Sequence, residues 1–331
     1  MKKNYNWAIL GAGRIAEKFA SDLKLLPNAK LYAVGSQSQE RAEKFALQHN
    51  VQKAYGTYEE MVKDPLIDVV YIATRHVFHY PNTLLCLNHG KAVLCEKPIA
   101  MNKNQFSVMA DTAKKNKQFF MEALWTKFIP SFKKCKELVE NGTIGDIKLI
   151  ESDFCFKAYF DKEGRLFNPL LGGGALLDIG IYPVFFALEM AGKPLKIEAF
   201  AGIGETKVDE NCTILFKHDN DILSTLCCSI TTNGRTEAIV HGTKGIIRIN
   251  REWHIPTSVD LLLNDKDAVH FSFEEPGFGY EYEAEEVMNC LDKGLIQSSL
   301  FGWQKSLDLI STLDIIREKA GITYPSELER V

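Results

Sequence analysis

A glycine-rich turn near the N-terminus constrains the fold of this chain more than any other feature. Gly11 and Gly13 follow a short apolar run at residues 7–10 and precede apolar residues at helical spacing over residues 15–23. A strand, a tight turn and a helix in that order let main-chain N–H groups approach a pyrophosphate at the start of the helix. Because both flanking elements are predicted, the turn indicates dinucleotide binding.

Each small residue of this turn has an expected part. Gly11 permits the turn, Gly13 lets a phosphate approach the main chain, and Ala16 replaces a third glycine against the strand. Arg14 and Ile15 begin the helix, so we expect them to contact the cofactor as well. The competing interpretation is a glycine turn that binds no ligand.

The alternation of strand and helix continues through the first third of the chain. Apolar runs at residues 31–34, 68–73 and 92–95 are typical of buried strands, and helical patterns lie between them. Strands that alternate with helices pair in parallel through right-handed crossovers. The sequence therefore predicts a doubly wound parallel sheet.

The residues after the second predicted strand bear on the choice of cofactor. An acidic residue there would bind the ribose 2′-hydroxyl of NAD, but this chain has Ser36, Gln37 and Ser38, with Arg41 one helical turn further on. Hydroxyl groups and a guanidinium suit a 2′-phosphate, so we expect NADP in preference to NAD. Alternatively, the serines cap the next helix and Arg41 is solvated.

Lys97 stands where the run at residues 92–95 ends, between Glu96 and Pro98. In an open parallel sheet the carboxyl ends of the strands bind ligands and hold catalytic groups, so an amine at this position is a candidate for chemistry. Pro98 fixes the backbone after the lysine, and we hypothesise a cis bond between Lys97 and Pro98.

The pattern changes beyond residue 122, where we place a domain boundary. Residues 131–140 read as an amphipathic helix, and many strand-like runs with few helices follow. We expect residues 1–122 to form the dinucleotide-binding α/β domain and residues 123–331 an α+β domain with a large, mainly antiparallel sheet. A further option is that late helices around residues 303–319 pack back on the first domain.

One segment of the second domain contains a candidate catalytic pair. Asp178 and Tyr182 are four residues apart, so a helix places the carboxylate and the phenol on one face amid apolar neighbours. A stretch of three glycines, residues 172–174, precedes them. The alternative is a buried structural pair in which Asp178 accepts the hydroxyl of Tyr182.

Composition excludes several partners. The chain has 331 residues and a net charge of -4, which provides no basic face for nucleic acid and no polybasic membrane patch. Its eight cysteines show no metal-ligand spacing, and no apolar run reaches the length of a signal or membrane segment. We expect a cytoplasmic protein without a bound metal.

Taken together, these motifs resemble the glucose–fructose oxidoreductase / inositol dehydrogenase (Gfo/Idh/MocA) family along nearly the whole chain. The matched motifs are the glycine turn, Thr74-Arg75-His76-Val77-Phe78-His79, Glu96-Lys97-Pro98, and Asp178 with Tyr182. The chain departs from the family pattern at Arg75 and His76, where proline and asparagine are usual. Residues 122–130 and 165–183 are most similar to the dimeric dihydrodiol dehydrogenase branch.

The resemblance implies a Rossmann domain and specific roles for the matched residues. Tyr182 would be the acid and base for a substrate hydroxyl, Lys97 the positive charge that favours the ionised phenol, and Asp178 an orienting group. Thr74, His79, Glu96 and Lys97 would join the glycine turn and Ser36 to Arg41 in binding the cofactor. Trp125 and Lys127 would border the substrate pocket. Phe154 follows the first predicted strand of the second domain and is a further candidate for the pocket. Core packing is the alternative for Trp125 and Phe154.

Two classes of function follow. The first is an NADP-dependent dehydrogenase or reductase that acts on a hydroxyl or carbonyl of a sugar, polyol or diol. The second is a non-catalytic regulator that binds a dinucleotide, because a fold does not fix a function. Retention of Lys97, Asp178 and Tyr182 favours the enzyme. We also expect a homodimer, or a dimer of dimers, formed through the sheet of the second domain.

Overall fold

The computed structural model describes residues 3–274, 276–325 and 328–331, which group into two compact units. The described residues of unit 1 are 3–125, 276–307 and 331, and those of unit 2 are 126–274, 308–325 and 328–330. The first segment thus ends three residues beyond the expected boundary. Residues 276–307, which the sequence prediction assigned to the second domain, group with unit 1 instead.

Hydrogen bonds across the sequence explain why residues 276–307 belong to unit 1. The Asp22 carboxylate accepts the main-chain N–H groups of Phe278 and Tyr280, each at 2.9 Å. The indole of Trp303 donates to the carbonyl of Phe120 at 2.9 Å, so this return segment is fastened at both ends. Helix α9 (Trp303–Ala320) starts here, but its residues from Asp308 onward group with unit 2.

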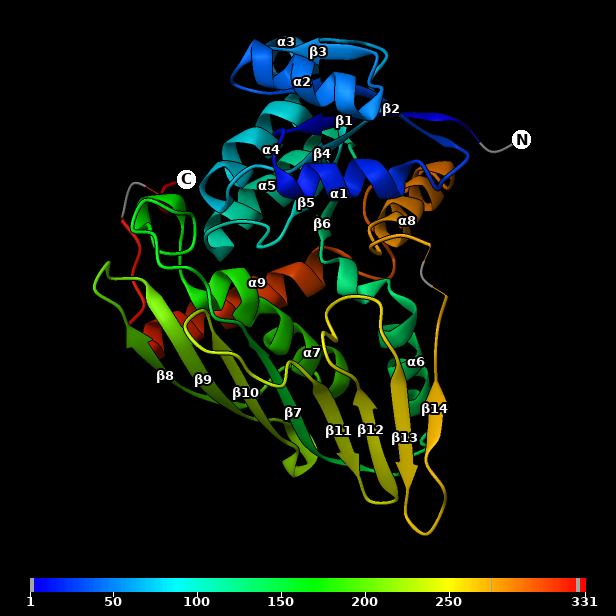
Figure 1. The fold of residues 1–331 in the computed structure, drawn as a ribbon, viewed down its shortest axis with the longest axis vertical. Coiled ribbons are helices and arrows are strands. Elements are labelled where there is room, and N and C mark those ends of the chain that lie inside the picture. Colours follow the sequence, from blue (N-terminus) through cyan, green and yellow to red (C-terminus); the bar gives the residue numbers. More distant parts are fainter. Residues whose placement is uncertain (1–2, 275, 326–327) are drawn as a thin grey trace. The chain divides into compact units, whose positions relative to one another are not determined.

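Unit 1 is built on a six-stranded parallel sheet in the order β3-β2-β1-β4-β5-β6 (Figure 1). Its strands are β1 (Tyr5–Leu10), β2 (Ala29–Gly35), β3 (Lys53–Tyr55), β4 (Val69–Ile72), β5 (Ala92–Glu96) and β6 (Phe120–Ala123). Its helices are α1 (Arg14–Leu23), α2 (Gln39–His49), α3 (Tyr58–Val62), α4 (His79–Asn88), α5 (Lys103–Asn116) and α8 (Glu281–Asp292). This order confirms the predicted doubly wound Rossmann sheet.

The strands of this sheet are apolar on both faces because helices cover both faces. Every residue of β4 and β5 is buried, which accounts for runs without polar alternation. Strands β1 to β3 are added toward one edge of the sheet and β4 to β6 toward the other, so the strand order reverses between β1 and β4. Strand β5 lies beside β4. The carboxyl ends of these three strands therefore adjoin, which brings the segments after residues 10, 72 and 96 to one edge.

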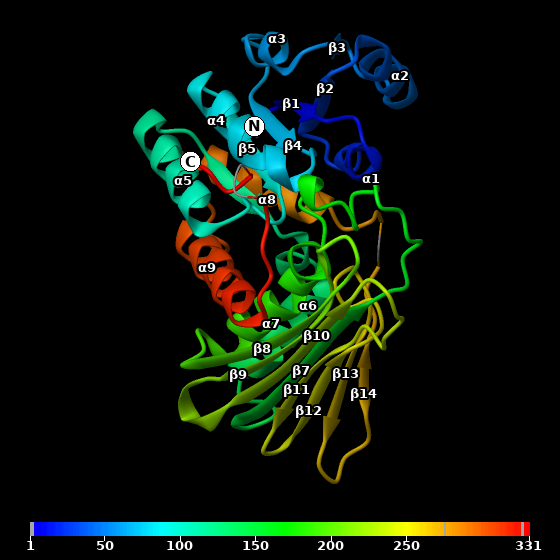
Figure 2. The same ribbon diagram turned by 90° about the vertical axis from the view of Figure 1, so that its left-hand side faces the viewer.

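Unit 2 contains an eight-stranded sheet in the order β14-β13-β12-β11-β7-β10-β9-β8 (Figure 2). Its strands are β7 (Ile147–Cys155), β8 (Lys196–Ile203), β9 (Asp209–Lys217), β10 (Leu223–Ser229), β11 (Ala238–Gly242), β12 (Gly245–Ile249), β13 (Val259–Leu263) and β14 (Val269–Phe271). Strands β7 and β10 pair in parallel, and the other neighbouring pairs are antiparallel. The expected α+β domain with a mainly antiparallel sheet is confirmed.

Helices cover one face of this sheet, as Figures 1 and 2 show. They are α6 (Pro130–Glu140), α7 (Ile181–Ala191) with a preceding π-helical turn (Leu176–Gly180), and α9. Strand β9 alternates accordingly, with Cys212, Ile214 and Phe216 buried and Leu215 about half exposed on the opposite face. The helical stretch Pro169–Ala191 is long and apolar enough to cross a membrane, but 89% of its most apolar window is buried in the protein.

Candidate active site

The glycine turn after β1 has the geometry that a bound pyrophosphate needs. Gly11 has φ +107°, and a Cβ there would lie 3.0 Å from the carbonyl oxygen of Ala73. A Cβ on Gly13 would meet no atom within 4 Å, which leaves space beside the start of α1. The N-cap of α1 makes no side-chain hydrogen bond, so its first N–H groups, from Arg14 and Ile15, can serve an anion. These residues fit a dinucleotide cofactor.

The side chains that follow β2 include a helix cap, a buried serine and exposed polar groups. Ser38 is the N-cap of α2, and its Oγ accepts the N–H of Arg41 at 3.4 Å, as the capping alternative required. Ser36 is buried, whereas Gln37 and the Arg41 side chain are exposed. Arg41 is thus a charged group at the edge of the sheet where a 2′-phosphate is expected, and NADP preference stays a prediction.

The Lys97–Pro98 peptide bond is cis, which confirms the hypothesis drawn from the sequence. Glu96, at the end of β5, holds the loop that follows. Its carboxylate accepts the hydroxyl of the buried Tyr71 and, at 3.2 Å, the main-chain N–H of Lys97. Glu96 therefore fixes the backbone that carries the lysine.

His79 joins this loop to the segment after β4. Its Nδ1 lies 2.8 Å from the carbonyl oxygen of Pro98, and its Nε2 lies 3.1 Å from that of Thr74. Complete burial lowers the pKa of His79 to about 4, so the ring is neutral at physiological pH and donates to only one of them at a time. These contacts give His79 a structural part, and its contact with the cofactor stays a prediction.

Glu122 supports the same loop from β6. Its carboxylate accepts the N–H of Ile99 at 3.0 Å, and its side chain is buried. Burial raises the pKa of Glu122 to about 7, and the neighbouring Glu96 carboxylate also raises it. Glu122 was noted in the sequence only as part of a motif, because its contact with Ile99 depends on strand pairing.

Thr74 lies beside the glycine turn. Its methyl group would be 3.1 Å from a Cβ on Gly11, and its hydroxyl accepts the side-chain amide of Asn82 at 3.2 Å. Trp125, by contrast, stacks on Tyr280 with ring centroids 4.2 Å apart and is 6% exposed. This packing within unit 1 supports the core interpretation of Trp125.

In unit 2, Tyr182 sits in α7 within an aromatic cluster. Its ring centroid is 5.5 Å from those of Phe154 and His254, and Trp253 meets it edge-on at 6.5 Å. Phe154 stacks on His254 at 3.9 Å, while the carbonyl of His254 accepts the hydroxyl of Thr126 at 2.7 Å. A place for Phe154 in the substrate pocket stays a prediction. Trp253 and His254 were missed, because they lie in a loop without periodicity.

Asp178 lies in the π-helical turn that precedes α7. Its carboxylate accepts a guanidinium N–H of Arg165 at 2.8 Å, and the Arg165 side chain is 54% exposed. The sequence analysis expected Asp178 to be an orienting group or the acceptor of the Tyr182 hydroxyl, and it did not name Arg165. The signal was present, because Arg165 begins the segment whose resemblance to the dihydrodiol branch was noted.

Lys127 forms a buried ion pair with Glu189 of α7, and its ammonium lies 5.4 Å from the centre of the Phe132 ring. Both contacts are internal to unit 2, so they anchor α6 and α7 to each other. A place for Lys127 in the substrate pocket stays a prediction.

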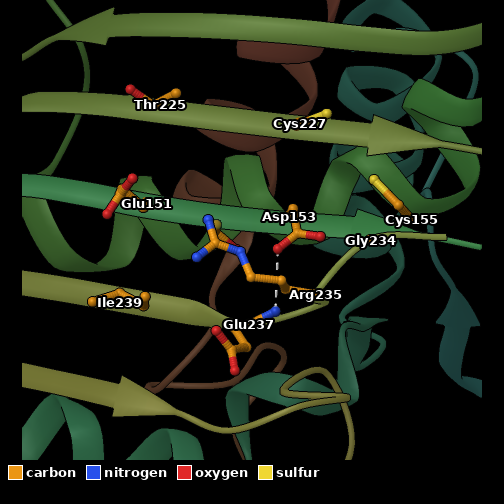
Figure 3. Close-up of a pocket in the computed structure, with 10 residues that line it drawn as sticks. Glu151, Asp153, Cys155, Thr225, Cys227, Gly234, Arg235, Glu237 and Ile239 are labelled. Carbon is orange, nitrogen blue, oxygen red and sulfur yellow. Dashed lines mark hydrogen bonds between the residues drawn. The ribbon is translucent and has the colours of Figure 1, made fainter. Parts of the chain in front are cut away.

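A separate pocket lies on the sheet face of unit 2 that the helices leave uncovered (Figure 3). It has a volume of about 360 Å³ and is lined by side chains of β7, β10 and β11, among them Asp153, Cys227 and Ile239. None of the residues predicted for catalysis lines it.

The fold and the site define a class of protein. A doubly wound sheet with a phosphate-binding glycine turn and a lysine at a strand end, followed by a unit with a large mixed sheet, is the organisation of a two-domain NAD(P)-binding oxidoreductase. The profile of an oxidoreductase family with an NAD-binding Rossmann fold matches residues 5–124, and that of the GFO/IDH/MocA C-terminal domain matches residues 132–248. The chain belongs to the GFO/IDH/MocA family.

Curated relatives extend over nearly the full length. The trans-1,2-dihydrobenzene-1,2-diol dehydrogenase of Mus musculus is 38% identical over 335 residues, covering 97% of this chain and 98% of the relative. The enzyme of the same name from Xenopus tropicalis is 37% identical over 333 residues, covering 96% and 99%. These relatives support an oxidoreductase.

Solved structures agree on the fold. The aldose-aldose oxidoreductase from Caulobacter crescentus, complexed with glycerol, has a TM-score of 0.88 at 21% identity, with 96% of this chain and 98% of that chain covered. KijD10, a 3-ketoreductase from Actinomadura kijaniata in complex with NADP and TDP-benzene, has a TM-score of 0.87 at 21% identity and the same coverage.

Proposed function

We propose that this protein is a cytoplasmic, NADP-preferring dehydrogenase or reductase that acts on a hydroxyl or carbonyl of a diol, polyol or sugar. The observation that carries the proposal is the retention of both halves of an acid–base pair, Lys97 at the end of β5 and Tyr182 in α7. The name shared by the relatives, a diol dehydrogenase, supports the reaction class. The eight free thiols suit a reducing compartment, and fractionation of expressing cells tests it.

In the proposed reaction, Tyr182 transfers the proton of the substrate hydroxyl. Oxidation of a secondary alcohol needs a base for the hydroxyl proton, and the phenolate of Tyr182 would accept it and return it in the reverse direction. The ammonium of Lys97 would favour the ionised phenol, because a nearby positive charge stabilises an anion. A bound nicotinamide would supply the hydride acceptor or donor. General acid–base help of this kind contributes about 10²–10⁴ in rate.

The surroundings of Tyr182 favour a cyclic substrate with an apolar face. Phe154 and His254 are partly exposed beside the phenol, and flat rings of this kind pack against the faces of other rings. Arg165 adds a guanidinium on the adjacent Asp178, which suits recognition of a second hydroxyl. We therefore place cyclic vicinal diols ahead of open-chain polyols.

Turnover with a substrate panel tests this function. The protein is mixed with NADP⁺ or NAD⁺ and with cyclic diols, open-chain polyols and aldoses, and absorbance of the reduced nicotinamide is followed. We expect reduction of NADP⁺ with at least one cyclic diol. Measurable cofactor binding without turnover of any substrate, in either direction, would instead support the dinucleotide-binding regulator.

A second copy of the chain is the proposed partner. The sheet face opposite the helices exposes Phe200, Leu215 and Leu223, which are 75%, 48% and 50% exposed. Apolar side chains of this size on an open sheet are typical of an association surface. We expect a homodimer or a dimer of dimers in sedimentation at micromolar concentration, and a shift toward monomer for Leu215→Glu. A wild-type monomer would contradict this assignment.

A further inference from the structure

The helical segment that carries Asp178 and Tyr182 starts against a carboxylate from another element. Asp209, the first residue of β9, is fully buried, and its Oδ2 accepts the main-chain N–H of Leu176 at 2.6 Å. The N–H of Ala175 also hydrogen-bonds to Asp209. The segment therefore has a capping carboxylate supplied from 33 residues further along the chain.

The three glycines at residues 172–174 make room for this contact. Gly174 has φ +127°, and a Cβ there would lie 2.2 Å from Oδ1 of Asp209. A Cβ on Gly173 would lie 2.7 Å from the carbonyl oxygen of Leu166. A larger side chain at Gly174 would collide with the carboxylate, and one at Gly173 would collide with the main chain before it, so the glycines let the segment start against Asp209.

The surroundings of Asp209 shift its pKa in opposite directions. Burial raises the pKa of this carboxyl to about 7, while the bonded N–H groups and the Arg317 guanidinium of α9 oppose the shift. Its other oxygen, Oδ1, has no hydrogen-bond partner among the described residues. Among the described residues, the phenol of Tyr324 and the thiols of Cys212 and Cys228 also face it.

The two protonation states of Asp209 hold the segment differently. An ionised carboxylate accepts the N–H of Leu176 through Oδ2, and its negative charge is stabilised by the positive end of the helix dipole. A protonated carboxyl loses that charge and turns one oxygen into a donor, so its grip on the N–H groups weakens. Because Asp178 and Tyr182 follow within two turns of Leu176, a change at this start moves both side chains.

We infer that Asp209 is a positioning residue, which fixes the Asp178–Tyr182 segment when ionised and loosens it when protonated. This inference rests on the proposed function only in taking Tyr182 as the acid–base group.

A pH titration followed by NMR tests the inference without turnover. The full chain is labelled with ¹⁵N-leucine and with tyrosine carrying ¹³C at the ring carbon that bears the hydroxyl. Signals of Leu176 and Tyr182 are identified by their loss in Leu176→Met and Tyr182→Phe. We expect both signals to shift with a shared midpoint at about pH 7. No shift between pH 5 and pH 9 at Leu176 would overturn the inference.

Two asparagine variants separate Asp209 from other carboxylates. In Asp209→Asn the shared transition should disappear. Asp153→Asn is the matched control, because Asp153 also accepts main-chain N–H groups, those of Thr236 and Glu237, but lies away from the segment. The control should keep the wild-type transition. Persistence of the transition in Asp209→Asn would assign it to another group and overturn the inference.

Kinetics supply the second measurement. Loss of a capping carboxylate should lower kcat of Asp209→Asn by roughly threefold to thirtyfold above pH 8, with KM within about twofold, and remove the part of the kcat–pH profile that titrates with Asp209. A profile that superimposes on wild type would contradict positioning. If wild type shows no turnover, the proposed function fails while the NMR titration still decides the part of Asp209.

Discussion

The loop that carries Lys97 and the helical segment that carries Tyr182 are held in different ways. In unit 1, side chains of Glu96, His79 and Glu122 each bond a different main-chain group of the loop. In unit 2, the start of the segment rests on the carboxylate of Asp209. A main chain bonded at three neighbouring groups tolerates the loss of one contact better than a main chain whose start is bonded by one carboxylate. If the proposed roles hold, the charge of Lys97 is the more rigidly held and the proton carrier Tyr182 the more adjustable.

The largest expected effect concerns the proton carrier itself. Tyr182→Phe should lower turnover by about a hundredfold or more, because it removes the acid–base group, and should leave cofactor affinity unchanged. Stopped-flow turnover and cofactor titration measure the two quantities. Tyr159→Phe is the matched control, since Tyr159 lies in the same unit and is 91% exposed. Near-normal turnover of Tyr182→Phe would remove the base assignment.

The next largest effect should be on cofactor affinity, through a residue of unit 1. Arg41→Ala should weaken NADPH binding by roughly tenfold to a hundredfold and change NADH binding little, because a charge-assisted bond to the 2′-phosphate is lost. Fluorescence titration with each cofactor provides the measurement. Lys44→Ala, on the same helix, serves as the control. Equal weakening for both cofactors, or tighter NADH than NADPH binding in wild type, would contradict the NADP assignment.

A smaller effect is expected when one of several anchors is changed. Glu122→Gln keeps an oxygen for the Ile99 N–H, so kcat should fall by about threefold or less, below the effect of Asp209→Asn. Parallel kinetics of the two variants at pH 8 test this ranking. A larger loss for Glu122→Gln would show that the loop of Lys97, not the segment of Tyr182, is the more sensitive region.

The last prediction concerns stability rather than activity. The pKa of Glu122 and of Asp209 is raised to about 7 in the folded protein, so the folded state binds more protons than the unfolded state between about pH 4 and pH 7. Their contribution to stability should therefore fall as pH rises through this window and level off above it. Urea unfolding at pH 5 and pH 8 should show ~1–3 kcal/mol less of this loss in Asp209→Asn than in wild type. Equal losses would place the titration elsewhere.

Much of unit 1 could be predicted from local pattern. Runs such as residues 68–73 and 92–95 read as buried strands because helices cover both faces of a parallel sheet. The turn at Gly11 was visible because its glycines, the preceding strand and the following helix are adjacent in sequence. Lys97 followed directly, since it ends one of those runs.

Unit 2 was predictable as a class of sheet but not in its contacts. Alternation along β9 indicated one covered face, and the spacing of Asp178 and Tyr182 placed them on one helical segment. The partners of that segment, Arg165 and Asp209, come from a loop and a strand. No periodicity marks either of them, because their side chains reach the segment only after the sheet has formed.

The sequence by itself determined the alternation of strands and helices in unit 1, the glycine turn and the residue types of the proposed acid–base pair. Each of these features depends on residues that lie within about two helical turns or one strand of each other, so their spacing can be read directly from the sequence. Only the tertiary structure decided that residues 276–307 return to unit 1, that Glu122 supports the loop of Lys97, and that Asp209 caps the segment of Tyr182. Those contacts join residues far apart in sequence, so packing selects them and local pattern does not.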